Sequence, residues 1–183
     1  MRGPLDITRE LLAAEILHEI VHLPRRIDSA ADLPAVLGLP PASCLAVRLF
    51  DADDTLVAAL LPANATPATS AIARAMRARA VRPTRPDRVS AITDYHPSLV
   101  CPVGLPTEVR TVADTLVRDQ EVVFAATGDG STALQIRTAD LLSLVGGTVA
   151  DLVEPGAASP AARHVDETAW RSAPMVAGAM LRR

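Results

Sequence analysis

The segment CLAVRLFDADDTLVAALLP, residues 44–62, contains two apolar runs on either side of an acidic stretch, Asp51–Asp54. Runs of this length that are bounded by turn-forming residues are typical of β-strands. The segment therefore predicts a hairpin with strands at residues 44–50 and 55–61. This hairpin makes a β-sheet the centre of the expected fold.

Further strands and helices are predicted on both sides of this hairpin. Apolar periodicity predicts strands at residues 109–114, 121–127, 132–137 and 149–153, and a bent strand-like run at 99–105. Cap and stop residues predict helices at residues 6–14, 29–38, 66–80, 86–92 and 138–145, with Thr138 capping the last. These elements alternate without a strict βαβ repeat. The expected fold class is therefore α/β, with a mixed, partly curled, barrel-like sheet flanked by helices.

The composition of the chain changes after Glu154, where the stretch PGAASPAAR begins. Proline and small residues clustered in this way are typical of linkers. With 183 residues, the chain is long enough for one domain with its own core. We expect a single domain at residues 1–155, followed by a linker and tail at residues 156–183.

The stretch HEIVH, residues 18–22, matches the zinc-protease pattern H-E-x-x-H. On a helix, His18 and His22 would share a face and could bind one Zn²⁺, while Glu19 polarised a water molecule. However, Pro24 follows closely, two β-branched residues lie inside the motif, and the third histidine of the extended motif is missing. We therefore expect a strand with solvated histidines and no metal site, and a zinc hydrolase is the weakest functional hypothesis.

Composition argues against several other classes of protein. Aromatic residues make up only 2% of the chain, which argues against binding of single-stranded nucleic acid by aromatic stacking. All 18 basic residues are arginine, which excludes a Schiff-base or P-loop lysine. Cys44 and Cys101 form no disulfide or metal pattern, and no apolar run is long enough to span a bilayer. We expect a cytoplasmic protein without cofactor or membrane partner, and the oligomeric state stays open.

Three segments of the chain resemble one protein family. They are SAADLPAVLGLPPASCLAVRLF at residues 29–50, TDYHPSLVCPVGL at 93–105 and ATGDGSTALQIRTADLLSLVGG at 126–147. Their order and spacing are similar to those of the YbaK family over residues 12–153. This family includes free-standing aminoacyl-tRNA deacylases and the editing insertion domain of bacterial prolyl-tRNA synthetases.

The resemblance implies a pocket in which the ester of a mischarged tRNA is hydrolysed. Backbone N–H groups in glycine-rich turns would stabilise the oxyanion that forms. The positions that the resemblance places at the catalytic centre are Ala46, Arg48, Gly128 and Asp129. Those that it places around the substrate are Tyr95, His96, Ser98, Cys101, Pro102, Gly104, Gly130, Ser131 and Thr132.

The sequence departs from the family pattern at two of these places. Ala46 stands where the family usually carries a lysine, and Arg48 lies two residues further on the same strand face. A guanidinium supplies a fixed positive charge but cannot act as a base at neutral pH. Ser98 and Leu99 stand where the family has a pair of glycines. The turn at residues 128–130 is also an ordinary hairpin turn, and Cys101 is either a nucleophile or a small core residue.

Six arginines lie within fifteen residues, at positions 74, 77, 79, 82, 85 and 88. Such a cluster is either a solvated face or a surface that contacts phosphates. We predict that Arg74, Arg77, Arg82 and Arg85 bind tRNA. The leading hypothesis is a deacylase that acts in trans on mischarged tRNA, with a synthetase as a further candidate partner. The alternative is a degenerate domain that binds tRNA or an aminoacyl-like molecule without hydrolysis.

Overall fold

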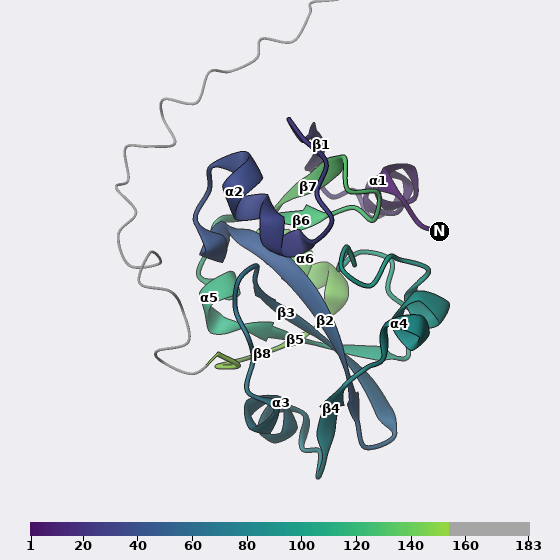
Figure 1. The fold of residues 1–183 in the computed structure, drawn as a ribbon, viewed down its shortest axis with the longest axis vertical. Helices are drawn as coiled ribbons and strands as arrows, with labels where there is room; N and C mark the ends of the chain where they lie inside the picture. Colours follow the sequence, from purple (N-terminus) through teal and green to yellow (C-terminus); the bar gives the residue numbers. More distant parts are fainter. Residues whose placement is uncertain (154–183) are drawn as a thin grey trace, which may run out of the picture.

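The computed structural model describes residues 1–153, whose eight strands form one mixed sheet flanked by helices (Figure 1). The strand order is β1-β7-β6-β2-β3-β5-β8, and β4 pairs with β2 off this path. The strands are β1 (His18–His22), β2 (Cys44–Ala52), β3 (Thr55–Pro62), β4 (Val81–Pro83), β5 (Val109–Asp114), β6 (Val122–Ala126), β7 (Thr132–Arg137) and β8 (Thr148–Ala150). The α/β class is confirmed, and the sheet is open because its outer strands β1 and β8 do not pair with each other.

Short helices lie between the strands and cover both faces of the sheet. The α-helices are α1 (Pro4–Ala13), α2 (Leu33–Leu37), α3 (Thr69–Met76), α4 (Pro86–Thr93), α5 (Thr115–Arg118) and α6 (Thr138–Val145). The 3₁₀ helices are η1 (Ala30–Asp32) and η2 (Pro41–Ser43). None of the helices within residues 1–153 is both long and hydrophobic enough to cross a lipid bilayer.

The predicted hairpin forms the middle of the sheet. β2 pairs antiparallel with β3 along its whole length, from Leu45 opposite Pro62 to Ala52 opposite Thr55. On its other side, β2 pairs with two different strands. Its first residues pair parallel with β6, and its last residues pair antiparallel with β4.

Alternation along β2 divides its side chains between two faces of the sheet. Leu45, Val47 and Leu49 join the largest core cluster, which also contains buried residues of α1, α4, α5 and α6. The other face, here called the Arg48 face, has two separate clusters. One contains Ala46 beneath η1 and α2, and the other contains Phe50 beneath α3. Figure 1 shows α2 near one end of β2 and α3 near the other.

The HEIVH stretch is strand β1, as predicted, and pairs antiparallel with β7. In a strand, His18 and His22 are separated by about 13 Å, so they cannot bind one ion together. Within residues 1–153 there is no group of three or more His, Cys, Asp or Glu side chains arranged to hold a metal. The HEIVH stretch is therefore explained by its place as an outer strand of the sheet.

The helix predicted at residues 66–80 is shorter than expected and stops at Met76. Arg77 adopts a left-handed conformation with φ of 56°, which ends the helix. The Asp53 carboxylate then accepts hydrogen bonds from the amides of Arg79 (2.9 Å) and Ala80 (3.0 Å). These contacts hold a turn that leads into β4, a strand that the sequence did not predict.

Two other local predictions were wrong. Residues 99–105 form no strand; Pro102 offers no N–H, and the Val103 carbonyl accepts a hydrogen bond from the Tyr95 hydroxyl instead. Thr138 is the first residue of α6 rather than its cap, and its buried hydroxyl has no hydrogen-bond partner within the described residues. The predicted tail at residues 156–183 lies outside the described residues.

Candidate functional site

A small cavity opens beside β2 on the Arg48 face of the sheet. It has a volume of ≈ 230 Å³, and we call it the β2 cavity. Its lining residues are Ser29, Ala30, Ala31, Ala46, Val47, Arg48, Ala63, Pro97 and Ser98. Three residues of the predicted site, Ala46, Arg48 and Ser98, thus meet in one cavity. Four of its lining residues are alanine, whose small side chains leave room for a small ligand group.

Among residues 1–153, no strand pairs with the Val47 backbone on the side of β2 that faces this cavity. In the antiparallel ladder with β3, Cys44 is a hydrogen-bonded position, because its carbonyl accepts the amide of Ala63 at 2.8 Å. Alternation then directs the Val47 N–H and C=O away from β3. On the side of β2 that faces away from β3, the parallel pairing with β6 ends at Leu45. The antiparallel pairing with β4 extends only as far as the Leu49 carbonyl, which accepts a hydrogen bond from the Thr84 amide. Val47 therefore offers one backbone donor and one acceptor to a ligand.

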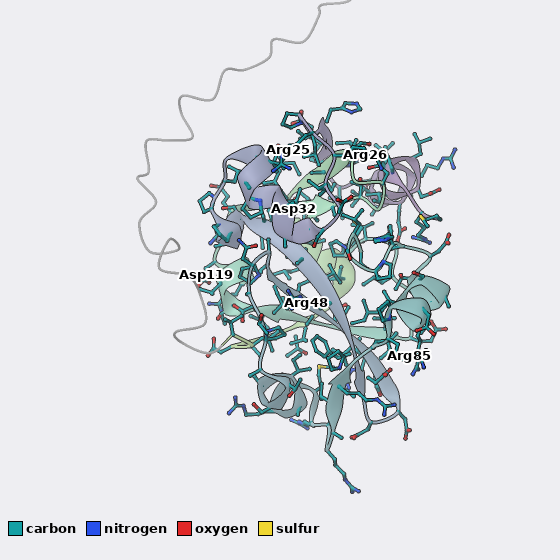
Figure 2. All side chains as sticks on the ribbon, in the orientation of Figure 1. Arg25, Arg26, Asp32, Arg48, Arg85 and Asp119 are labelled. Carbon is teal, nitrogen blue, oxygen red and sulfur yellow. The ribbon has the colours of Figure 1, made fainter. Side chains whose placement is uncertain are left out.

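Arg48 supplies the charge of the β2 cavity. Its side chain is exposed between the two apolar clusters of this face, and Figure 2 shows it on β2. No carboxylate of residues 1–153 lies within ion-pair distance of its guanidinium. An exposed guanidinium without a carboxylate partner favours an anionic ligand group.

One wall of the β2 cavity belongs to residues 23–31, here called the strap. Its Ala30 amide donates to the Ser98 carbonyl at 2.9 Å, and its Ile27 amide donates to the Gly130 carbonyl at 2.8 Å. The Arg26 guanidinium also donates to the Asp129 carbonyl at 2.7 Å. The strap therefore ties the 96–99 segment to the glycine-rich turn between β6 and β7.

The turn at residues 127–132 is organised around the Asp129 carboxylate. This carboxylate accepts hydrogen bonds from the amides of Ser131 (2.8 Å) and Thr132 (3.1 Å) and from three hydroxyl groups. Burial alone would raise the pKa of Asp129, but these hydrogen bonds outweigh it and hold the pKa below its ordinary value. Asp129 therefore stabilises the turn, and the two amides are not available to a ligand.

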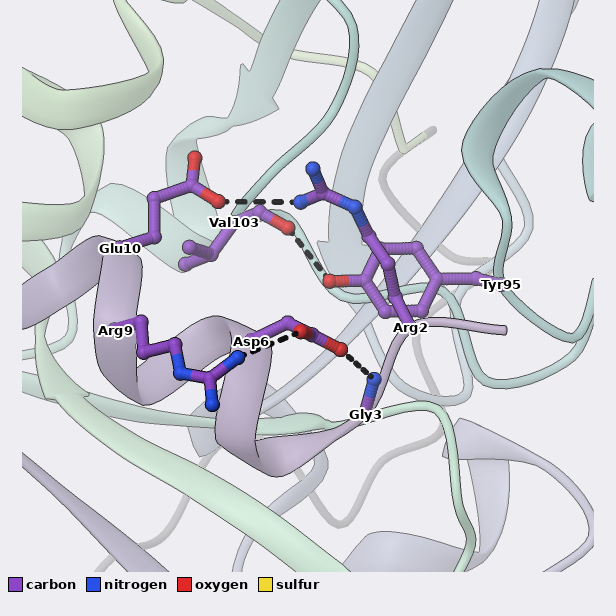
Figure 3. A network of polar contacts seen from close by, with 7 residues as sticks. All are labelled: Arg2, Gly3, Asp6, Arg9, Glu10, Tyr95 and Val103. Atoms are coloured by element: carbon purple, nitrogen blue, oxygen red, sulfur yellow. Dashed lines mark hydrogen bonds and ion pairs between the residues drawn. The ribbon is translucent and has the colours of Figure 1, made fainter.

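The structure places Tyr95, Gly104 and Gly128 around the N-terminal segment, and they do not line the β2 cavity. The buried Tyr95 hydroxyl donates to the Val103 carbonyl at 2.9 Å, while Arg2 Nη1 donates to Glu10 at 3.1 Å (Figure 3). A Cβ at Gly128 would lie 2.7 Å from the Arg2 carbonyl oxygen, and one at Gly104 would overlap the Arg2 guanidinium. Both glycines therefore permit the N-terminal segment to pack closely.

His96 and Cys101 have different surroundings. His96 is exposed, and its Nδ1 accepts the amide of Ser98 at 3.3 Å, so its ring supports the turn that leads into the cavity wall. Cys101 is fully buried, and its neighbour Pro102 is buried too. Burial raises the pKa of the Cys101 thiol to about 12. A thiol that stays protonated at neutral pH is a poor nucleophile. Cys101 therefore acts as a small core residue.

The clustered arginines are all exposed, but ion pairs divide them into two sets. Arg82 and Arg88 both contact the Asp51 carboxylate, at 3.5 and 3.0 Å, and Arg85 contacts Asp87 at 3.2 Å. Arg74, Arg77 and Arg79 have no ion pair within residues 1–153. Of the four arginines predicted to bind tRNA, two are thus partnered by carboxylates and two are not.

Sequence reasoning did not find the strap or Val47 as parts of the site. The side chain of Val47 faces the core, so its type carries no signal. Residues 29–31 could be recognised from the sequence only by their position, because they follow strand β1 and precede a helix that packs over β2. The pairing that exposes the Val47 backbone involves strands far apart in the chain, and no short motif encodes it.

Comparisons with known proteins identify the family and the fold. Residues 25–144 match the model of the aminoacyl-tRNA editing domain family. Hypothetical protein APE2540 superposes with a TM-score of 0.75 at 19% identity, covering 81% of this chain and 99% of that one. A protein described as a candidate trans-editing enzyme for prolyl-tRNA synthetase gives a TM-score of 0.71 at 21% identity, covering 81% and 95%.

A more distant neighbour belongs to a larger protein. It is a candidate signal transduction protein from Marinobacter aquaeolei VT8, with a TM-score of 0.61 at 16% identity, and the match covers 83% of this chain and 31% of that one. None of the curated proteins matches the chain. The family match includes residues 25–31 of the strap, all the residues that line the β2 cavity and the Asp129 turn. It shows that the chain belongs to the aminoacyl-tRNA editing domain family.

Proposed function

We propose that this protein hydrolyses the ester of a mischarged tRNA in trans, as a cytoplasmic deacylase. The observation that supports this most is the β2 cavity of an editing-family chain. In it lie together a backbone edge and an arginine that both lack a partner among residues 1–153. A volume of ≈ 230 Å³ with alanine walls suits a small aminoacyl group. A donor and an acceptor on one residue suit a group that carries both an amine and a carbonyl.

In this proposal the Val47 N–H donates to the ester carbonyl oxygen, and the Val47 carbonyl accepts from the α-ammonium group. A backbone donor aimed at the carbonyl oxygen gains strength as negative charge develops there in the transition state. Arg48 adds a positive charge beside the same oxygen. The oxygen of a water molecule adds to the carbonyl carbon, the bond to the ribose 3′ oxygen breaks, and the 3′ oxygen leaves with the proton that the water has lost. The substrate's own 2′-hydroxyl orients the water, since guanidinium cannot take up the proton.

One observation favours a second function, in which the domain binds the charged tRNA end without hydrolysing it. Among residues 1–153, those that line the β2 cavity include no carboxylate, histidine, cysteine or lysine. On the resemblance described above, Ala46 stands where the family usually carries a lysine. A site without a general base lacks a contribution that is typically 10²- to 10⁴-fold in rate. Binding without turnover is therefore the function expected if the 2′-hydroxyl does not suffice.

The two functions are separated by incubating the protein with a panel of mischarged tRNAs, starting with alanyl-, cysteinyl- and seryl-tRNA. Hydrolysis predicts release of the amino acid above the uncatalysed rate. In Arg48→Gln this release should fall about 10- to 100-fold, while Arg48→Lys should keep part of it because the charge is retained. Protection of the ester with retention of the tRNA would show the binding function instead. Unaltered decay with no tRNA retained would contradict both.

A further inference from the structure

The sheet separates the arginine cluster between its two faces. Val89 of α4 packs into the core on the face opposite Arg48, and Arg88 of the same helix contacts Asp51. In contrast, Ile72 and Met76 of α3 pack against Phe50 on the Arg48 face. Arg74 and Arg77 therefore belong to an element on the same face as the β2 cavity, whereas Arg85 and Arg88 do not.

Several arginines on the Arg48 face lack a carboxylate partner within residues 1–153, among them Arg25 and Arg26 of the strap and Arg110 of β5. Those of the β2 cavity and of α3 are Arg48, which lines the cavity, and Arg74 and Arg77, in and directly after α3. Arg79, the next arginine in the chain, lies near the Asp53 carboxylate and helps to lower the pKa of that carboxylate. Part of the positive charge of Arg79 is therefore offset. An arginine already paired with a carboxylate must give up that contact to bind a phosphate. An unpaired arginine pays no such cost.

The spacing along β2 sets the distance between the β2 cavity and α3. Ala46 lines the cavity, and Phe50, four residues later, packs beneath α3. At about 3.3 Å per residue this is about 13 Å of strand. A ligand whose end lies in the cavity must therefore extend by a few nucleotides to reach α3. A short single-stranded 3′ end followed by a helical stem has this form.

We propose that Arg74 and Arg77 bind the phosphates of the helical stem next to the single-stranded 3′ end of the RNA, while Arg48 lies beneath the single strand. This rests on the proposed function for the identity of the ligand, but it concerns only binding of the stem. It assigns no stem contact to Arg82, Arg85 and Arg88, whose charges are partnered by carboxylates. Arg77 is the C-cap of α3 in a left-handed conformation, which sets the position from which its side chain projects.

The test uses the full chain and an uncharged RNA hairpin with a single-stranded 3′ end, whose binding is measured at several salt concentrations. Each phosphate contact that is lost should lower the slope of log K against log salt by about 1. In Arg74→Gln/Arg77→Gln the slope should fall by about 2, and the affinity at low salt should fall at least tenfold. Arg74→Lys/Arg77→Lys should keep most of the slope.

Arg9→Gln/Arg118→Gln is the control. It removes the same charge from two exposed arginines that are paired with Asp6 and Asp119 and that lie on α1 and α5, helices that pack on the opposite face. The control should keep both slope and affinity. Equal losses in the two double variants, or no loss in either, would overturn the proposal. Hydrolysis of an aminoacylated trinucleotide without a stem should be the same in wild type and Arg74→Gln/Arg77→Gln. If wild type hydrolyses nothing, the proposed function fails while the binding result still decides this inference.

Discussion

Five hydrogen bonds to the carboxylate of Asp129 make this single side chain the fixed point of the β6–β7 turn. Removing the carboxylate leaves two amides and three hydroxyls without this acceptor. We expect Asp129→Ala to lower the free energy of unfolding by about 1–3 kcal/mol at neutral pH. Urea unfolding measures this, with Asp119→Ala as the control. Asp119 is an exposed residue with one ion pair, to Arg118. Asp119→Ala should therefore lower the free energy of unfolding by no more than about 1 kcal/mol.

The cost of Asp129→Ala should also depend on pH. The pKa of Asp129 is lowered by folding, so the folded state holds fewer protons than the unfolded state near the ordinary value of 3.8. The contribution is therefore fully present above this value and is lost as the pH falls through the lower pKa of the folded state. Unfolding curves of wild type and variant should converge below about pH 4. A constant difference from pH 3 to pH 7 would contradict this account.

Ala46 is the residue whose small size keeps the β2 cavity open. In Ala46→Leu the larger side chain would fill the space, and we expect release of amino acid or retention of tRNA to fall at least tenfold. Overpacking should cost about 1–3 kcal/mol of stability, which thermal unfolding measures. Ala58→Leu is the control, because Ala58 is equally buried on the neighbouring strand but faces the opposite core. It should lower stability and leave ligand binding of the folded protein intact.

At the scale of elements, the strap and the Asp129 turn depend on close backbone contact. Gly130 has φ of +71°, and a Cβ there would overlap the Ile27 carbonyl oxygen of the strap. Gly38 has nearly the same φ, +66°, with nothing within 4 Å of a Cβ. Gly38→Ala should therefore lower the free energy of unfolding only by the strain of a left-handed alanine, about 1–2 kcal/mol. Gly130→Ala should lower it by more. Chemical unfolding of both variants measures the difference, and equal costs would show that the strap yields easily.

Elements with regular local patterns were predicted well from the sequence, and those fixed by distant contacts were not. β7 was placed at residues 132–137, as observed, because the turn at residues 128–131 precedes its apolar run and a helix begins directly after it. β4 was missed, because Val81–Pro83 has no apolar alternation and becomes a strand only by pairing with the end of β2. Among the predicted site residues, Ala46, Arg48 and Ser98 meet in one cavity. The free edge at Val47 depends on where two ladders stop, which no local pattern shows.

At the scale of the whole molecule, the last described residues close the edge of the sheet. Leu152 is fully buried, and the Asp114 carboxylate accepts the amides of Leu152 (2.8 Å) and Val153 (3.0 Å). A chain ending at residue 155 should therefore keep its stability within about 0.5 kcal/mol. A chain ending at residue 150 should lose about 2–5 kcal/mol, because it lacks the buried leucine. Thermal unfolding of both chains tests whether residues 1–155 form the proposed domain.

The surface charges also show what sequence can and cannot reveal at this scale. Six arginines in fifteen residues are visible in the sequence as one cluster. Their division by carboxylate partners is not visible, because Asp51 lies more than thirty residues before Arg82 and Arg88 and meets them only through the pairing of β4 with β2.

Tyr95, the single tyrosine of the chain, gives the protein an optical reporter of its own folding. Its ring is fully enclosed, and burial is the main reason why the pKa of its hydroxyl is raised above the ordinary value. In alkali, ultraviolet absorption by the phenolate should thus emerge only when the native structure opens. Spectrophotometric titration with base would then follow denaturation at the junction of the N-terminal segment and the 94–104 loop, without any added label.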